Sequence, residues 1–218
     1  MTTLLAATAV FLLMHFVPST PLRPVLVKAI GEWPYRGLYS LVALAALAWM
    51  ISAYADAPRE PLWPGLRYVP LVAMPIAFVL LACGYWRNPT MVGADRLLKS
   101  GEPARGMIRI TRHPLMWAIL LWAGAHVLAR GDLKSLVFFG GFLLLAGLGT
   151  LTIDARKKSN PDWARFAAAT SNLPFAAIAQ GRNRIAWREI GWLRPLIGLA
   201  LFAAFFTGHP WLFGARPY

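Results

Sequence analysis

Six apolar runs, spread along the whole chain, limit what this sequence can fold into. A helix needs about 20 apolar residues to cross a bilayer. The second, third and fifth runs nearly reach that length, and the other three are shorter, with softer bounds. Because a backbone in lipid must satisfy its own hydrogen bonds, such runs predict packed helices. The runs are Leu4 to Val17, Gly37 to Ala55, Val69 to Trp86, Pro114 to Leu128, Leu136 to Ile153 and Pro195 to Gly208.

The composition agrees with a membrane protein. Of 218 residues, 58% are hydrophobic and only 14% are charged, whereas a soluble domain has about 25% charged residues. The polar stretches between the runs are too short to form a second domain. We therefore predict an all-α, polytopic membrane helical bundle with six transmembrane helices, formed by one domain over residues 1–218.

The basic residues predict the orientation of this bundle. The net charge is +13, and seventeen of the 22 Lys and Arg residues fall in the first, third and fifth loops. Cytoplasmic loops are enriched in Lys and Arg, so both termini are expected outside. The first run has no Lys or Arg before Arg23 and no small-residue cleavage pattern, which favours a retained span over a signal peptide. This distribution indicates anionic membrane lipids as partners and argues against nucleic acid.

Two of the four histidines, His15 and His126, lie inside apolar runs. A polar ring in hydrocarbon needs a partner, and a neutral imidazole is a common metal ligand. Each is open to two interpretations: a hydrogen bond to a neighbouring helix, or a bound ligand. His126 follows the small residues Ala123, Gly124 and Ala125, which would leave space beside it for a flat group.

Arg112 and His113 are a second candidate pair. They precede Pro114, at the mouth of the fourth run, where a helix N-terminus attracts anions. The pair could hold a carboxylate or phosphate, or it could simply anchor the helix at the interface. His209 is expected to be interfacial only. The sequence contains no CxxCH motif around its single Cys83, so any haem would be b-type. No Ser/His/Asp grouping or carboxylate pair supports hydrolysis.

Five separated motifs, which occur in family order, resemble the NnrU family of bacterial membrane proteins over nearly the whole chain. They are His15 to Arg23, Gly31 to Arg36, Asn88 to Thr90, Ile108 to Pro114 and Ala125 to Asp132. The resemblance implies a bacterial inner (cytoplasmic) membrane protein with periplasmic termini. It also implies an association with denitrification, through nitrite and nitric oxide metabolism.

The NnrU family is similar to the zeta-carotene isomerases of plants, which carry haem b between two histidines. Their histidine motifs match here at His15 and His126, and their tail matches Pro174 to Ile178 with Gly181 and Arg182. The resemblance therefore implies haem b with His15 and His126 as iron ligands, and a lipid-soluble polyene or a small gaseous substrate. Where the isomerases have a cysteine one turn before the second histidine, this chain has Ala123. Ligand switching by that thiol is excluded.

A wider resemblance joins Arg112-His113-Pro114 and the stretch from Asp154 to Pro174 to isoprenylcysteine and phospholipid methyltransferases. It implies a related plan of helices and an S-adenosylmethionine site, although the acidic pair of those enzymes is replaced here by Ile153-Asp154-Ala155-Arg156. A methyltransferase-like enzyme is thus an alternative function. A non-catalytic accessory to assembly of denitrification enzymes is another, and a homo-oligomer is compatible with either.

The proposed iron ligands differ in expected depth. His15 ends the first run, whereas His126 lies twelve residues beyond Pro114, or about 18 Å along a helix that rises 1.5 Å per residue. His113 is expected at the depth of His15 and is the alternative partner. The family motifs favour His15 with His126.

Overall fold

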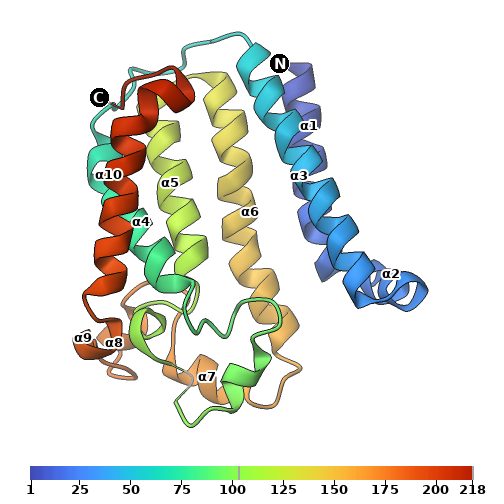
Figure 1. Ribbon diagram of the computed structural model, residues 1–218, viewed down its shortest axis with the longest axis vertical. Coiled ribbons are helices and arrows are strands. Elements are labelled where there is room, and N and C mark those ends of the chain that lie inside the picture. Colours follow the sequence, from blue (N-terminus) through green and yellow to red (C-terminus); the bar gives the residue numbers. More distant parts are fainter. Residues whose placement is uncertain (103, 218) are drawn as a thin grey trace.

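The computed structural model describes residues 1–102 and 104–217 (Figure 1), and within them it confirms the predicted helical membrane bundle, with no β-strand. Each apolar run forms one helix. Four of these helices are long and apolar enough to cross a membrane, and α4 and α5 are shorter. The six are α1 (Thr2–Phe16), α3 (Glu32–Asp56), α4 (Val69–Gly84), α5 (Pro114–Arg130), α6 (Leu133–Lys157) and α10 (Leu193–Phe213).

The helices form two groups. In the first, which we call the row, α10 packs against α4, α4 against α5, and α5 against α6. In the second, α1 packs against α3, and this pair reaches the row through α6. Figure 1 shows α1 and α3 diverging from α6 towards the end that carries α2. We call the contact between the α1–α3 pair and helices α5 and α6 the seam.

A tight turn joins α5 to α6 and explains one family motif. Gly131 adopts φ +63°, and a Cβ there would collide with the carbonyl oxygen of Trp63. Asp132 then caps α6 by accepting a hydrogen bond from the Ser135 N–H at 2.9 Å. Left-handed backbone favours glycine, and aspartate is a preferred N-cap. These two residues therefore fix where α5 ends and α6 begins.

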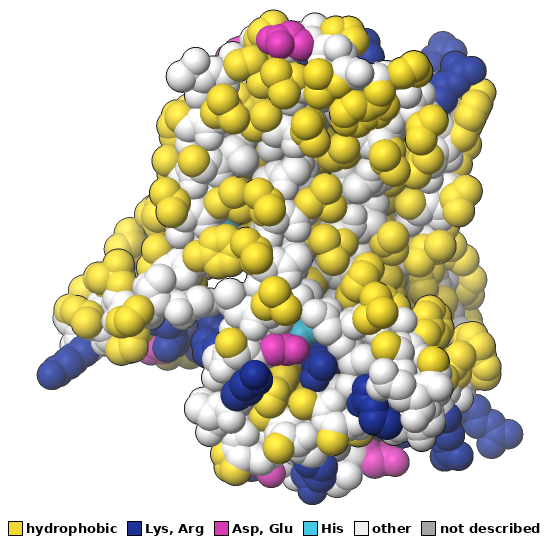
Figure 2. Space-filling view, turned by 180° about the vertical axis from the view of Figure 1, so that it is seen from behind, with side chains coloured by type: hydrophobic (Ala, Val, Ile, Leu, Met, Phe, Trp, Pro, Cys, Tyr) yellow, Lys and Arg dark blue, Asp and Glu magenta, His cyan; other side chains and the backbone are white. Residues whose placement is uncertain are grey.

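The two ends of the molecule differ in charge. Lys and Arg gather at the lower end in Figure 2, while hydrophobic side chains cover the helices above. Both chain termini lie at the opposite end (Figure 1). We call the two ends the basic end and the terminal end. Short helices fill the basic end: η1 (Val17–Ser19), α2 (Leu22–Ile30), η2 (Asp95–Lys99), η3 (Gly106–Arg109), α7 (Trp163–Ala169), α8 (Ala176–Ala179) and α9 (Trp187–Ile190).

Helix α2 was not expected from the sequence. It mixes Arg23 and Lys28 with exposed Leu22, Val25 and Ile30, a pattern typical of a helix lying in the membrane interface. Its nine residues are too few and too polar to register as an apolar run.

Three hydrophobic clusters hold the fold together. The largest joins α1, α3, α5 and α6 through residues that include Leu4, Phe11, Met50, Ala123 and Phe139. A second lies between α4 and α5, and a third lies among η2, η3 and α7. The largest cluster fills the part of the seam away from the basic end.

Candidate functional site

Polar contacts tie the seam together at the terminal end. The hydroxyls of Tyr54 and Ser135 are 3.0 Å apart, and the Lys134 ammonium donates to the carbonyls of Tyr54 and Ala57. Arg59 also pairs with the buried carboxylate of Asp132 at 3.2 Å. Helix α3 and the start of α6 are thus fastened together at this end.

Below this fastening, aromatic rings run along the seam. Successive centroids lie 4.2 to 6.3 Å apart, within or near the range in which rings attract one another. We call this set the aromatic row. In order from the terminal end, it consists of His126, Trp122, Phe142, Phe11, His15, Tyr39 and Tyr35.

Both histidines of the aromatic row have a defined tautomer. Nδ1 of His15 lies 2.7 Å from the carbonyl oxygen of Phe11, and Nδ1 of His126 lies 2.7 Å from that of Trp122. A carbonyl oxygen can only accept, so Nδ1 carries the proton in each case. The neutral ring then has a lone pair on Nε2, which is the arrangement found in histidines that ligate metals.

The structure does not place the rings of His15 and His126 in contact with each other. Phe11, Phe142 and Trp122 lie between them in the aromatic row. The two imidazole nitrogens that bind one metal ion from opposite sides lie only about 4 Å apart, because each metal–nitrogen bond is about 2 Å. A haem held by both histidines therefore does not fit this arrangement. Within residues 1–102 and 104–217, no group of three or more His, Cys, Asp and Glu could hold a metal ion.

The space expected beside His126 is filled. The ring of Phe139 stacks on the His126 imidazole at 5.0 Å, with an angle of 29° between the planes. Ala123 and Ala125 are buried, and Ala123 belongs to the largest hydrophobic cluster. The small residues thus serve close helix packing.

At the basic end the seam opens into a cavity of about 650 Å³. Its walls come from η1, α2 and α3 on one side and from η2 and the end of α6 on the other. Tyr39 and Tyr35, which end the aromatic row, line it. Figure 2 shows the hollow between the projecting α2–α3 corner and the rest of the basic end.

Arg112 and His113 belong to a different place. The His113 side chain is fully buried, and its Nε2 lies 2.6 Å from an Asp154 oxygen. Arg112 lies 3.5 Å from the other oxygen of the same carboxylate. Burial lowers the pKa of Arg112, although Asp154 opposes this shift. His113 therefore has its Nε2 engaged with Asp154, whereas its buried Nδ1 has no hydrogen-bond partner among the described residues.

This cluster docks a loop onto the bundle. The Thr111 hydroxyl and the Trp117 indole both donate to the carbonyl of Asn172, and the Asn172 amide donates to Thr150. The Arg112 N–H donates to the carbonyl of Ser171. Buried His113, paired with Asp154, completes an anchor that joins α5, α6 and the loop. This arrangement is a structural contact and not an open ligand site.

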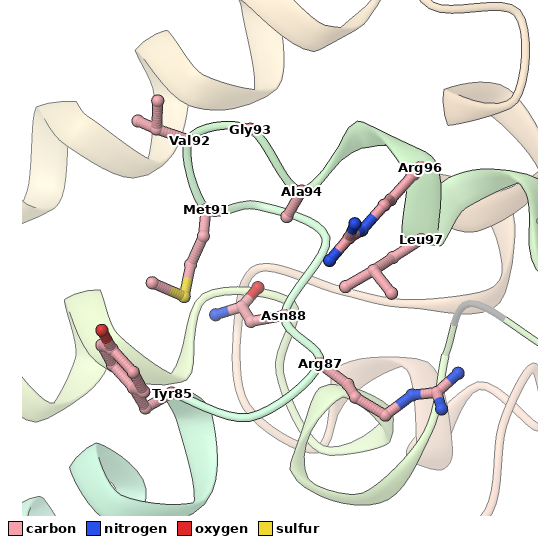
Figure 3. Close-up of a pocket in the computed structure, with 9 residues that line it drawn as sticks. All are labelled: Tyr85, Arg87, Asn88, Met91, Val92, Gly93, Ala94, Arg96 and Leu97. Carbon is pink, nitrogen blue, oxygen red and sulfur yellow. The ribbon is translucent and has the colours of Figure 1, made fainter.

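A smaller cavity of about 230 Å³ follows α4 and is drawn in Figure 3. Asn88 there donates to the Gly84 carbonyl and accepts from both the N–H and the hydroxyl of Thr90. The side chain of Arg87 points away from the cavity (Figure 3). The Asn-Pro-Thr motif therefore caps α4, and its side-chain polar groups are engaged.

A further motif residue, Arg109, also proves structural. Its guanidinium forms two 2.8 Å hydrogen bonds to the Glu189 carboxylate, which also accepts from the Gly106 N–H. The hydrogen bonds from Arg109 hold the pKa of Glu189 at about 2. This pair fastens η3 to α9.

The fold and the seam define a polytopic helical membrane protein with histidines embedded in an aromatic interface. The chain belongs to the NnrU family, because the model of that family, described as NnrU protein, matches residues 3–217. It is also similar to the chloroplastic 15-cis-zeta-carotene isomerase of Arabidopsis thaliana, at 28% identity over 208 residues. The match covers 89% of this chain and 56% of that protein, so the chain spans little more than half of its relative. No solved structure matches the chain.

Reasoning from the sequence missed Tyr35, Tyr39, Trp122 and Phe142. A signal was present, because Phe11 and His15, Tyr35 and Tyr39, Trp122 and His126, and Phe138 and Phe142 are all four residues apart. Residues at this spacing stack on one helix face. Which faces meet one another depends on the packing of α1 against α6.

Proposed function

We propose that this protein is a membrane isomerase of a lipid-soluble polyene that binds along the seam. The observation that carries the proposal is the aromatic row, an elongated apolar surface between two helix groups. A conjugated polyene is itself long, apolar and flat, so it can pack against a succession of aromatic faces. The similarity to 15-cis-zeta-carotene isomerase supports a double-bond isomerisation at this surface.

Substrate would enter as the seam opens from the basic end. The polar fastening of Tyr54, Lys134 and Ser135 lies at the terminal end, and the cavity lies at the other. Lipid tails are as apolar as the rings they would replace, so separating the two helix groups in a bilayer costs less than in water. The α1–α3 pair can therefore pivot on its fastened end.

Haem b stays a prediction for this chain, resting on the family resemblance. If bound, it would supply a redox-active iron whose reactivity depends on its axial ligands. His15 and His126 each offer a free Nε2, but together they do not fit one iron, so no step is assigned to the haem. Absorption spectra of the purified protein with added hemin test this ligation, comparing wild type with His15→Ala, His126→Ala and His209→Ala. Loss of the Soret band in both of the first two variants, with the third unchanged, would support a shared iron.

The membrane and the orientation are also proposed. We place the protein in the bacterial inner membrane with both termini periplasmic, because the basic end carries most Lys and Arg. Single cysteines at positions 158 and 67, in a Cys83→Ser background, test this. Labelling of position 158 only from the cytoplasm and of position 67 only from outside is expected. The opposite labelling pattern would show that the protein has the inverted orientation in the membrane.

Isomerisation itself is tested in liposomes kept in the dark, with and without hemin. We expect purified protein to convert 15-cis-zeta-carotene to its 15-trans isomer, as followed by chromatography. His209→Ala, outside the seam, is the matched control for His126→Ala and should keep full activity. Conversion no faster than in protein-free liposomes, in both hemin arms, would refute the proposed activity. A role in denitrification or a methyl transfer would then be the remaining candidates.

A further inference from the structure

The cavity at the basic end has a polar character that an apolar polyene does not need. Five cationic side chains line it, against three carboxylates. The cations are Arg23, Arg36, Lys99, Arg156 and Lys157, and the carboxylates are those of Glu32, Asp95 and Asp162. The lining thus has a net positive charge.

Two of the carboxylates are already engaged. Glu32 accepts from Arg23 at 2.8 Å and from Arg36 at 2.8 Å, which holds both guanidiniums in place. Asp95 pairs with Lys157 at 2.7 Å. Asp162 also lines the cavity, and it forms no ion pair with any residue that the structure describes. Within the parts of the chain that the structure describes, Lys99 and Arg156 have no carboxylate partner, so two cations remain available.

A buried hydroxyl supplies a second, independent observation. Tyr35 lines the cavity, is only 7% exposed, and its hydroxyl has no hydrogen-bond partner among the described residues. Its ring is held in place by Tyr39 at 6.2 Å and by the Arg23 guanidinium at 5.8 Å. Buried polar groups in folded proteins are normally hydrogen-bonded, so an unpaired donor beside a basic cavity indicates a missing acceptor.

An interfacial α2 would place the cavity at the depth of lipid headgroups. Helix α2, which forms one wall, exposes Leu22, Val25 and Ile30, as a helix in the interface does. Basic pockets between transmembrane helices on the cytoplasmic side bind phosphate-bearing headgroups. Phosphate oxygens accept hydrogen bonds from guanidinium, ammonium and hydroxyl groups together.

We propose that this cavity binds a phosphate group, which accepts from Lys99, Arg156 and the Tyr35 hydroxyl. The phosphate could be carried by an anionic lipid or could be a free phosphate from the aqueous side. The inference stands apart from the proposed isomerisation, because it concerns a different ligand and a direct binding measurement.

The test is calorimetric titration of the full-length protein, purified in a neutral maltoside detergent without phosphate. The probes are dihexanoyl phosphatidic acid, dihexanoyl glycerol and inorganic phosphate. We expect one phosphatidic acid to bind per chain and the phosphate-free glycerol not to bind. Inorganic phosphate that competes only at much higher concentration would identify a lipid as the source. Tighter binding of inorganic phosphate would identify a soluble one.

Variants separate the cavity from the general charge of the basic end. The double variant Lys99→Gln/Arg156→Gln should weaken binding at least tenfold. Lys158→Gln/Arg188→Gln, which removes two exposed cations outside the cavity, should change it less than twofold. Tyr35→Phe should weaken binding several-fold and leave the melting temperature unchanged, since only an unpaired hydroxyl is lost. No binding of either phosphate probe, or equal losses in the two double variants, would overturn the proposal.

Discussion

The basic end and the seam are built in different ways. Around η3, α9 and the loop after α7, side chains are held by directed hydrogen bonds and ion pairs, as in the pairs Arg109–Glu189 and His113–Asp154. Along the seam, α1 meets α6 through apolar contacts, which include the rings of Phe11 and Phe142. Directed contacts fix one geometry, whereas ring contacts in lipid can separate and re-form.

The family motifs divide along the same line. Asn88, Arg109, Arg112, His113 and Asp132 hold turns and loops, and they are engaged with protein groups. The seam motifs instead contribute His15 and His126, in each of which Nδ1 is hydrogen-bonded and Nε2 has no partner among the described residues. One set of motifs thus specifies the scaffold and the other the site.

The largest effect on stability is expected at the basic end, from Asp154→Ala. This change leaves the buried His113 and the partly buried Arg112 without their carboxylate and should cost about 3 kcal/mol, as breaking a buried ion pair does. Thermal melting in detergent measures it. Asp56→Ala, at an exposed carboxylate, is the matched control. A melting temperature within 1 °C (roughly 0.3 kcal/mol) of wild type would show that the anchor contributes little.

A pH-dependent effect is expected from Glu189→Gln. Because the folded pKa of Glu189 is about 2, against an ordinary value of 4.5, its pairing with Arg109 stabilises the protein above pH 4.5. That contribution, about 1 to 2 kcal/mol after solvent screening, is lost as the pH falls towards 2. The difference in melting temperature between wild type and variant should therefore shrink over this range. A constant difference would assign the effect to packing.

In the seam, removing a larger side chain should cost less stability. Phe142→Ala removes a whole ring, yet we expect a loss of only about 1 to 2 kcal/mol, below the 3 to 5 typical of aqueous cores, because lipid can fill the space. Isomerisation should fall at least tenfold. If the melting temperature falls as far as in Asp154→Ala, the seam is as rigid as the basic end, and the two regions do not differ in the proposed way.

The sequence predicted the scaffold better than the site. The six apolar helices follow directly from the apolar runs, since each run needs only local hydrophobicity to be recognised. Asn160 followed by Pro161 is a pattern typical of a helix start, yet α7 begins at Trp163, and Asn160 accepts from the Asp162 N–H in the preceding turn. Helix α2 was not predicted, because its charged residues interrupt its apolar face.

The site depended on contacts between distant segments. Counting residues along α5 indicated that His15 and His126 differ in depth, and the rings between them agree with that count. Neither the stacking of Phe139 on His126 nor the pairing of Asp154 with His113 follows from local sequence. Both depend on how α6 packs against α5, which no single segment encodes.

Entry of the substrate through the seam is tested most directly by a disulfide that joins α1 to α6. A Cβ on Gly141 would stand 2.7 Å from Cγ2 of Thr8, so Thr8→Cys with Gly141→Cys in a Cys83→Ser background brings two thiols within disulfide reach across α1 and α6. In liposomes with 15-cis-zeta-carotene, the oxidised protein should isomerise at least tenfold more slowly than the same protein after reduction. An oxidised protein that keeps the reduced rate would contradict entry of the substrate between these helices.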